Sequence, residues 1–495
     1  MVKTSPEKTS KRIDKISHKT TKNMPSLRNI GILFASIQLI AFIAFIVTIT
    51  KLNLLHEWQL VIVSFFAVAA QIFTFSKALS SRSKKGVKIF AIILSAILSL
   101  VFFIGQNYSR KTIDLIQSAT GVHYETQNYS VLVLKTSGYN EISQLRNQNI
   151  GYLTSNPNFE DTRTTLHNVI NHHVQSYDDL ASMISSIYAF QTSAIVLNDN
   201  YLEYIEESDS EFINESKIIY TFEVRKEAED KPAQVDVKTE PFAIYLSGSD
   251  SRGTISDTAR SDVNIVIVVR PQDGKILLVN IPRDYYVQLH GTTGTRDKLT
   301  HAGVYGIDMS RKTIEDLLGI EINYTAKVGF NTVIKVVDAL GGIDIDSDQE
   351  FTAHTNKTCH FKYGVQHVDS TCALAFSRER YAYATGDRHR GENQQAVITA
   401  IIEKLSNPKY MLKYTDIINA AQGSFETNLS YDEITNFAKQ QLSSLKNWEV
   451  ESIALDGSGA MMPTYSMGAR KLYVIIQNQS TISSDQAKIK EYLAK

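Results

Sequence analysis

The 495-residue sequence has very few cysteines and almost no net charge, and both features limit the classes of function that it fits. Its 51 Lys and Arg nearly balance its 52 Asp and Glu, so no global basic character points to nucleic acid. Only Cys359 and Cys372 occur, near His354, His360 and His367, without the paired Cys-x-x-Cys pattern of common zinc sites. We therefore favour a disulfide that pins a loop, with a zinc site as the alternative.

Although the net charge is close to zero, basic and apolar residues are concentrated in separate parts of the chain. Residues 1–28 are rich in Lys, Arg, Ser and Thr, which predicts a disordered basic tail. Three apolar stretches follow, at residues 30–50, 58–76 and 87–104; the first two carry no charge and the third is entered through Lys84, Lys85 and Lys88, and stretches of about 20 residues can cross a bilayer. Three such stretches in series, with no small-residue cleavage site after the first, make a single signal peptide a poor explanation.

The loops between these stretches set an expected orientation. The basic tail and the second loop, residues 77–88, carry many Lys and Arg, whereas the first loop, residues 51–57, has a single Lys. The positive-inside rule then places the N-terminus in the cytoplasm. After three crossings, we expect everything beyond about residue 106 to lie outside the cell, in a compartment where a disulfide persists.

The remaining chain predicts an α/β protein in two parts. We expect three transmembrane helices over residues 29–106, a small α/β accessory domain over 107–224, a linker over 225–240, and a larger α/β domain over 241–495 with a central sheet flanked by helices. The accessory domain shows no Gly-rich phosphate loop and no nucleophile elbow. It is therefore expected to be a scaffold or a partner-binding unit.

The stretch 242–284 opens the larger domain and carries the first charged cluster. Residues 242–246, 263–269 and 276–281 are short runs rich in β-branched residues, which predict buried strands. Charged side chains gather at the strand ends: Asp250, Arg252, Arg260, Asp262, Arg283 and Asp284. Carboxylates that hold a divalent cation and guanidinium groups that bind phosphate are what a metal-assisted phosphate site requires. The alternative is a set of solvated ion pairs.

A second charged cluster lies further along the chain. Arg378 and Arg380 are two residues apart, and Asp387 and Arg390 follow closely. We expect Gln394 to open a helix over residues 392–405, whose N-terminal N–H groups favour a phosphate. So dense a group of arginines repels itself unless anions neutralise it, which favours an anion site over a cationic surface stripe paired with nearby carboxylates.

The motifs resemble a known family. GSDSR, ARSDVNIVIVV, IPRD, VVDALGG, FSRERY and GDRHRGENQQ are similar in order and spacing to the LytR–CpsA–Psr (LCP) family over residues 241–405. The three spans and the intervening domain resemble the streptococcal-type, capsule-associated members. The resemblance implies a Mg²⁺-dependent phosphotransferase, with Mn²⁺ as an alternative ion. It would move a polyprenyl-pyrophosphate-linked glycan, capsular or another wall glycopolymer, onto peptidoglycan and release polyprenyl phosphate.

The resemblance also assigns roles to residues. Asp250 and Asp262 would hold the metal, and they would form the catalytic set together with Arg260, Arg283, Arg378 and Arg380. The pyrophosphate and lipid site would comprise Arg252, Arg260, Arg283, Arg378, Arg380, Asp387, Arg390 and Gln394. Implied partners are the lipid-linked glycan, the peptidoglycan acceptor, membrane lipid and capsule-assembly proteins, without nucleic acid. The resemblance does not assign the general base. The alternative functions are a membrane-bound regulator of capsule biosynthesis or transcription, and a lipid pyrophosphatase.

Overall fold

The structure is a computed structural model. It describes residues 27–80, 82–120, 124–156, 158–202, 205, 210–227, 235–249, 259–407, 409–410, 417, 420, 425–444 and 446–494. The predicted basic tail lies outside these residues, except for its last two positions. Contacts between Cα atoms divide the chain into a helical unit near the N-terminus and a larger unit that begins, apart from one short loop, at Tyr108.

Three helices are long and apolar enough to cross a membrane: α1 (Leu27–Leu52), α2 (Glu57–Leu79) and α3 (Lys85–Ala119). Large apolar side chains such as Phe65 and Phe66 point outward, as expected of helices that are surrounded by lipid. Inside this unit, the hydroxyl of Thr74 on α2 donates a 3.0 Å hydrogen bond to Gln38 of α1. Such interhelical hydrogen bonds join helices where no hydrophobic force does. The predicted apolar spans are confirmed as helices.

A small mixed sheet forms the accessory domain, with strand order β3-β2-β4-β1-β5. Strand β2 runs parallel to β3 and β4, and β1 runs antiparallel to β4 and β5. Leu166 of α4 is buried on one face of the sheet and Met183 of α5 on the other. The elements are β1 (Tyr124–Leu134), β2 (Asn149–Leu153), α4 (Phe159–Val169), β3 (His173–Tyr177), α5 (Leu180–Tyr188), β4 (Ala194–Asn198), α7 (Ser210–Glu215) and β5 (Ser216–Glu227).

The segment predicted as a linker is partly ordered into its neighbours. Strand β5 continues to Glu227, which lies inside the predicted linker. Val237 is 3% exposed and packs with Phe242 and Ile265 in the core of the larger domain. Apolar contact therefore ties the end of this segment to the sheet that follows it.

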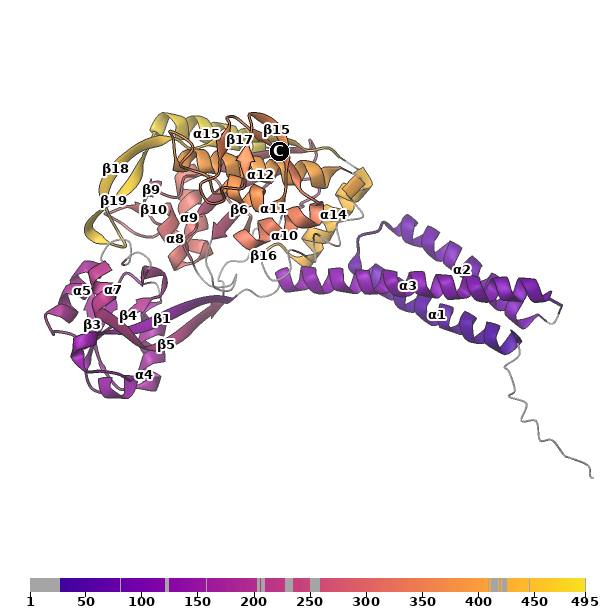
Figure 1. The fold of residues 1–495 in the computed structure, drawn as a ribbon, viewed down its shortest axis with the longest axis horizontal. Coiled ribbons are helices and arrows are strands. Elements are labelled where there is room, and N and C mark those ends of the chain that lie inside the picture. The colour runs from indigo at the N-terminus through magenta and orange to yellow at the C-terminus, as the bar shows by residue number, and fades with distance from the viewer. Residues whose placement is uncertain are drawn as a thin grey trace, which may run out of the picture. The chain divides into compact units, whose positions relative to one another are not determined.

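A six-stranded sheet forms the centre of the larger domain (Figure 1). In spatial order its strands are β16 (Phe425–Thr427), β11 (Tyr324–Gly329), β6 (Phe242–Ser249), β7 (Val263–Arg270), β8 (Lys275–Asn280) and β17 (Glu449–Ala454). Strands β11 and β6 are parallel, as are β8 and β17, whereas β7 runs antiparallel to β6 and β8. Strands β6, β7 and β8 cover the three predicted strands.

Helices cover both faces of this sheet. On one face, Val266 and Val268 pack with Ile314 of α9 and Ile482 of α15. On the other face, Ile265 packs with residues of α12 and α14. The alternation along β7 therefore sends successive side chains into opposite cores. The helices are α8 (Leu299–Ala302), α9 (Ile307–Leu318), α10 (Phe330–Leu340), α11 (Ser370–Ser377), α12 (Asp387–Ser406), α14 (Tyr431–Ser444) and α15 (Gln479–Leu493).

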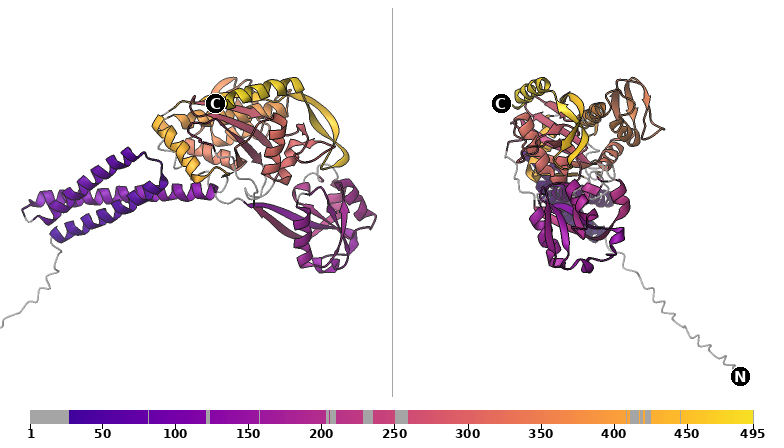
Figure 2. Two further views of the ribbon diagram at one scale, coloured as in Figure 1. Left: turned by 180° about the vertical axis from the view of Figure 1, so that it is seen from behind. Right: turned by 90° about the vertical axis from the view of Figure 1, so that its left-hand side faces the viewer.

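Short strands and one long hairpin surround this core. They are β9 (Tyr286–Val287), β10 (Asp297–Lys298), β12 (Ile343–Ser347), β13 (Phe351–Thr352), β14 (His360–Phe361), β15 (Gly364–Val368), β18 (Gly457–Thr464) and β19 (Gly468–Gln477). The β18–β19 hairpin reaches the accessory domain, with its yellow tip beside the purple accessory domain in Figure 2. Met467 and Leu472 of this hairpin belong to the same apolar cluster as Met183 of α5. The predicted fold class, an α/β protein with three apolar N-terminal helices, is confirmed.

Candidate functional site

The topology of the central sheet brings charged residues to one edge. Asp262 immediately precedes β7, and Arg283 follows the end of β8. Because β7 runs antiparallel to both neighbours, the start of β7 meets the ends of β6 and β8. Asp250 and Arg252, which come after β6 in the sequence, lie outside the described residues. The order of the strands therefore makes Asp262 and Arg283, two members of the predicted first cluster, neighbours in space.

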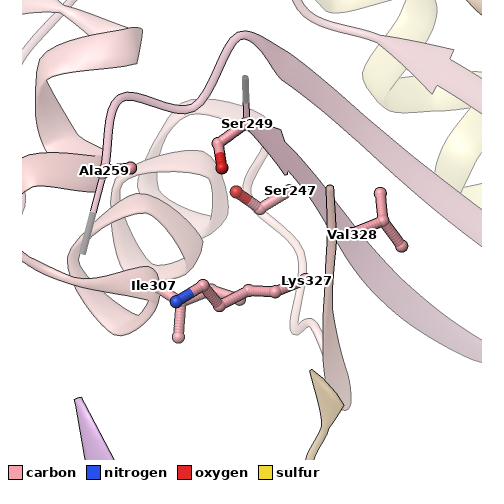
Figure 3. Close-up of a pocket in the computed structure, with 7 residues that line it drawn as sticks. Ser247, Ser249, Ala259, Ile307, Lys327 and Val328 are labelled. Atoms are coloured by element: carbon pink, nitrogen blue, oxygen red, sulfur yellow. The ribbon is translucent and has the colours of Figure 1, made fainter. Parts of the chain in front are cut away.

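Buried hydroxyl groups fix the backbone that carries Asp262. The Asp262 N–H donates a 2.8 Å hydrogen bond to the carbonyl of Gly248, which extends the β6–β7 ladder. The Ser261 hydroxyl lies 2.8 Å from that of Ser247 and 3.1 Å from that of Tyr245. Figure 3 shows Ser247 at a pocket of about 10 Å³, room for roughly one water molecule, between the ends of β6 and β11. This satisfied polar network gives Asp262 a rigid support.

Arg283 is the centre of an ion-pair network. Its Nη1 donates a 2.8 Å hydrogen bond to Asp262, and its Nε lies 3.7 Å from Asp387 and 3.8 Å from Asp284. Arg390 in turn lies 2.9 Å from Asp387. Carboxylates and guanidinium groups therefore alternate across this edge, so the like charges predicted to repel one another are separated by opposite ones.

Burial acts on both guanidinium groups of the network. Burial lowers the pKa of Arg283, but the carboxylates of Asp262, Asp387 and Asp284 outweigh it and raise the pKa above its ordinary value. For Arg390, burial is again the largest effect and lowers the pKa; Asp387 and Asp262 raise it, Arg283 and Arg380 lower it, and the pKa stays below its ordinary value. Burial therefore dominates at Arg390, whereas the carboxylates dominate at Arg283.

The network also leaves hydrogen-bonding capacity unused. Within the described part of the chain, Arg283 Nε is buried and makes no hydrogen bond. Asp387 Oδ1 is buried without one as well, although its ion pairs to Arg390 and Arg283 are 2.9 and 3.7 Å long. Buried polar atoms in native proteins rarely lack partners, so an unsatisfied guanidinium N–H here indicates a site for an anionic oxygen.

Helix α12 delivers Asp387 and Arg390, and it begins earlier than predicted. The helix starts at Asp387 rather than near residue 392, so Gln394 lies two turns inside it and does not open it. Asp387, Arg390 and Gln394 are spaced i, i+3 and i+7, which places them on one face. The predicted start of this helix is therefore wrong, since its first turn contains Asp387 and Arg390, and the expected role of Gln394 in phosphate binding stays a prediction.

A glycine sets the position of that first turn. A Cβ atom added at Gly391 would lie 2.1 Å from Nδ2 of Asn280, the last residue of β8. One turn further on, the Gln395 side chain donates 2.9 Å hydrogen bonds to the carbonyls of Leu278 in β8 and Ile453 in β17. Helix α12 therefore lies directly against the ends of two strands, with its charged turn beside Arg283.

The two arginines after α11 flank a buried carboxylate. Helix α11 ends at Ser377, so Arg378 and Arg380 do not share a helix face. Glu379 is 1% exposed and accepts N–H hydrogen bonds from the backbone of Arg380, Tyr381 and Ala382. These donors outweigh burial, which would raise the pKa of Glu379, and they lower it below its usual value. Glu379 thus fixes the backbone of the loop that carries the two arginines.

Their side chains point to different surroundings. Arg378 lies over the ring of Phe330, with 5.1 Å between the guanidinium carbon and the ring centroid. Arg380 lies over the ring of Tyr381, with 4.8 Å between the guanidinium carbon and the ring centroid. It is also close enough to Arg390 to lower the pKa of that residue. Arg380 therefore joins the network electrostatically, whereas Arg378 borders it at the start of α10.

A second pocket continues from the network. It measures about 220 Å³, and its lining includes Arg260 and Arg283 from the predicted set. It also includes Lys298, which the sequence did not single out, and which lies 2.9 Å from Asp284. Lys298 reaches this place through the β9–β10 pairing, a contact with no local sequence signal.

The two cysteines form a disulfide between the β13–β14 connection and α11. Cys359 and Cys372 are bonded, with their Cα atoms 5.4 Å apart. Cys359 is 1% exposed and packs in the same apolar cluster as Val337 and Leu340 of α10. The bond ties the first turn of α11 to the connection between β13 and β14, and α11 leads directly to Arg378.

The metal expectation rests on residues of which only part is described. Among the described residues, no group of three or more His, Cys, Asp or Glu side chains is placed to hold a metal ion. Asp262 is present at the sheet edge, 16% exposed, and its carboxylate oxygens are the ligands that Mg²⁺ prefers. The carboxylates present fit such an ion, and the Mg²⁺ and Mn²⁺ expectations remain predictions.

These features define an α/β protein with a partly buried network of arginines and carboxylates at one end of its central sheet and three helices long and apolar enough to cross a membrane. The chain belongs to the LytR–CpsA–Psr family, because the model of the LytR_cpsA_psr family matches residues 212–486. The resemblance stated from the motifs is thereby confirmed.

The chain is similar over about half of its length to named relatives and to solved structures. A polyisoprenyl-teichoic acid–peptidoglycan teichoic acid transferase, TagU of Bacillus mycoides (strain KBAB4), is 38% identical over 224 residues, which are 45% of this chain and 72% of that protein. The TagU of Enterococcus faecalis is 32% identical over 235 residues, 47% of this chain and 75% of that protein. The crystal structure of B. subtilis TagV is 28% identical with a TM-score of 0.44, covering 52% of this chain and 98% of that one.

Proposed function

We propose that the protein is a phosphotransferase that moves a glycan, with one phosphate, from a polyprenyl diphosphate to a hydroxyl group of peptidoglycan. The observation that carries the proposal is the buried guanidinium of Arg283, set among Asp262, Asp284 and Asp387 with one N–H unsatisfied. Membership of a family whose named relatives are polyisoprenyl-linked teichoic acid transferases supports the same reaction class.

The reaction exchanges one P–O bond for another. The oxygen of the acceptor hydroxyl bonds to the phosphorus that carries the glycan, the bond from that phosphorus to the bridging oxygen breaks, and polyprenyl phosphate leaves with the electron pair. Negative charge grows on the bridging oxygen and on the equatorial oxygens. Arg283 and Arg390 would bind these oxygens, and Arg380 and Arg260 would add positive charge at the rim.

The carboxylates act by placing the arginines. Asp387 lies between Arg390 and Arg283, and Asp262 holds Arg283 at its other end. Because these guanidinium groups are positioned before substrate binds, little reorganisation is needed as charge develops. Asp262, together with Asp250, would hold Mg²⁺, which when bound supplies further charge neutralisation at phosphate oxygens. The proton of the acceptor hydroxyl must leave during the attack, and the base that takes it is not assigned.

The setting of the site follows from the helices. We place the sheet domain outside the cell, with α1, α2 and α3 as the membrane anchor, because the loop charges favour that orientation. A lipid-linked donor would then reach the site from the membrane, and peptidoglycan would reach it from outside. The glycan would be a capsular or other wall polymer, and capsule-assembly proteins would be neighbours rather than substrates.

The test is product analysis with the full-length protein in phosphatidylcholine nanodiscs. A synthetic polyprenyl diphosphate carrying an oligosaccharide is incubated with peptidoglycan fragments and Mg²⁺, and the products are identified by mass spectrometry. We expect a phosphodiester-joined product and polyprenyl phosphate. Free oligosaccharide phosphate as the main product, with acceptor present, would instead identify a lipid pyrophosphatase.

Two matched arginine variants sharpen this test. Arg283→Ala removes the central guanidinium and should lower the transfer rate by roughly 10²–10³-fold, as loss of one preorganised donor does. Arg270→Ala is the control, because Arg270 ends the same strand β7 at the opposite edge and pairs with Asp273 at 2.7 Å. Equal activity of the two variants would contradict the proposed site.

A further inference from the structure

The first turn of α12 contains a histidine that the phosphotransfer network does not use. Asp387 and Arg390 belong to the network around Arg283. His389 lies on the opposite side of the same turn, since each residue of an α-helix is rotated by about 100° from the one before. We propose that His389 is a positioning residue for transfer and that it acts as a charged imidazolium. The inference rests on the proposed function, because the turn that it places carries two groups of that site.

Two carboxylates flank the His389 ring, one at each nitrogen. Nε2 lies 3.3 Å from the carboxylate of Asp348, in the connection between β12 and β13, and Nδ1 lies 2.9 Å from that of Glu392, one turn further along α12. A neutral imidazole carries a proton on only one nitrogen, whereas an imidazolium carries one on each. Only the charged ring therefore complements both carboxylates at once. We call Asp348, His389 and Glu392 the histidine clamp.

Packing holds the ring between these carboxylates. The side chain of His389 is 13% exposed and stacks on Tyr383, with 3.5 Å between the ring centroids and 20° between the ring planes. Tyr383 is itself buried in the apolar cluster around β12 and α11. The side chain of Gln349, next to Asp348, donates a 2.9 Å hydrogen bond to the carbonyl of Ala382. The connection that carries Asp348 is thus joined to the segment that carries the stacked tyrosine.

Arg388 anchors the same turn to the central sheet. Its Nη1 donates a 2.6 Å hydrogen bond to Asp456, just after β17, and its Nε lies 3.8 Å from Glu392. Guanidinium groups do not lose their charge in proteins, so this anchor does not depend on pH. Loss of the charge on His389 would weaken the contact to the β12–β13 connection and leave the anchor at the sheet. The charged turn would then shift without unfolding of the helix.

The groups around the ring define the pH range in which the histidine clamp can act. The titratable or charged neighbours are Asp348, Glu392, Arg388 and Tyr383. Burial raises the pKa of Tyr383 to about 12, so the tyrosine is neutral at physiological pH. Carboxylates and guanidinium groups ordinarily keep their charges between pH 6 and pH 8, whereas histidine ordinarily loses its charge in this range. We therefore expect the clamp to hold at pH 6 and to weaken by pH 8.

The first experiment measures transfer at pH 6 and pH 8 with full-length protein in phosphatidylcholine nanodiscs. The rate of each variant is divided by the wild-type rate at the same pH, so that the titration of other groups cancels. We expect uncharged His389→Gln to transfer roughly tenfold more slowly than wild type at pH 6, because two partly exposed charge pairs are together worth about that factor. At pH 8 the difference should shrink to about twofold, since the wild-type ring is then largely neutral.

Two aspartates provide a matched pair of variants. Asp348→Asn removes one carboxylate of the histidine clamp and should slow transfer about threefold at pH 6. Combined with His389→Gln, it should add little further loss, because the two residues act through one contact. Asp344→Asn is the control, since Asp344 lies 2.7 Å from another histidine, His367, and is 63% exposed against 62% for Asp348. The control should transfer at the wild-type rate at both pH values.

The second experiment follows the turn itself and does not depend on transfer. Amide hydrogen exchange of peptides that cover residues 386–392 is measured by mass spectrometry at pH 6 and pH 8, each variant against wild type at the same pH. We expect His389→Gln and Asp348→Asn to exchange faster than wild type at pH 6 and much less so at pH 8, whereas Asp344→Asn should match wild type.

The two readouts separate the histidine clamp from the transfer reaction. A ratio of variant to wild-type transfer rate that is equal at pH 6 and pH 8 would overturn the inference, and so would wild-type exchange in both clamp variants. The expected exchange pattern, in a wild-type protein that forms no joined product, would leave the histidine clamp standing and refute the proposed transfer.

Discussion

Substituting Gly391 by alanine should misplace the charged turn of α12 without removing any charge. The new Cβ would lie 2.1 Å from Nδ2 and 2.7 Å from Cγ of Asn280, which is 3% exposed. Ordinary contact between such atoms needs more than 3.4 Å, so the buried Asn280 side chain or the helix itself must move by roughly 1 Å. Overpacking of this kind costs about 1–3 kcal/mol in the free energy of unfolding. A shift of about 1 Å at a catalytic site can cost about 10²-fold in rate.

The assay combines thermal unfolding with the transfer rate of the full-length protein in nanodiscs. We expect Gly391→Ala to unfold at a lower temperature and to transfer about 10²-fold more slowly. Adding Asn280→Ala makes room for the new methyl group, so the double variant should recover part of both losses, a coupling that distant sites do not show. If Gly391→Ala transfers at the wild-type rate, the close approach of α12 to β8 does not position Asp387 and Arg390.

Three further changes test other parts of the site. Glu379→Gln should lower the free energy of unfolding by about 2 kcal/mol, since charge-assisted hydrogen bonds are lost. The pKa of Glu379 is lowered in the fold, so the stability difference between wild type and variant should be complete above the ordinary pKa near 4.5. Urea titrations should show this difference shrinking as the pH falls below that value. Cys359→Ser with Cys372→Ser opens a loop of sequence separation 13, so the free energy of unfolding should fall by about 3 kcal/mol. Asp387→Asn should slow transfer more than it lowers the free energy of unfolding, because it keeps the two arginines but removes the charge that orients them. A variant with the wild-type stability and the wild-type transfer rate would show that Asp387 is not needed to place them.

The central strands were predictable because their composition and their burial agree. Strand β7 is β-branched throughout except at Asn264 and its last residue Arg270, and its residues lie in the two cores on opposite faces of the sheet. Charged residues at the ends of such runs must leave the core, so Asp262 and Arg283 could be placed at strand ends. That they meet at one edge also needed the antiparallel order of β6, β7 and β8.

The start of α12 was mispredicted for a physical reason. Residues 387–390 are almost all charged, with no apolar periodicity, and Gly391 resembles a helix boundary. The helix nevertheless begins at Asp387, because tertiary contacts with β8 and β17 support it where local propensity does not. Gly391 lies inside the helix, where its lack of a side chain allows the close approach to Asn280.

Other elements lacked a local signal altogether. Strand β3 was not predicted, since it is an exposed edge strand of five mostly polar residues without alternation. Lys298 enters the site only through the pairing of β10 with β9, and Arg470 only through the placement of the β18–β19 hairpin. Such residues depend on contacts between distant segments, which residue patterns along the chain do not encode.

The most direct test of the central claim is the affinity of the full-length protein for polyprenyl diphosphate relative to polyprenyl monophosphate. The alternation of Asp262, Arg283, Asp387 and Arg390 predicts that wild-type protein binds the diphosphate at least tenfold more tightly in Mg²⁺. Arg283→Ala should remove most of this preference, and Arg270→Ala should leave it intact. Equal affinity of the wild type for both lipids, or a preference that survives Arg283→Ala, would contradict the account.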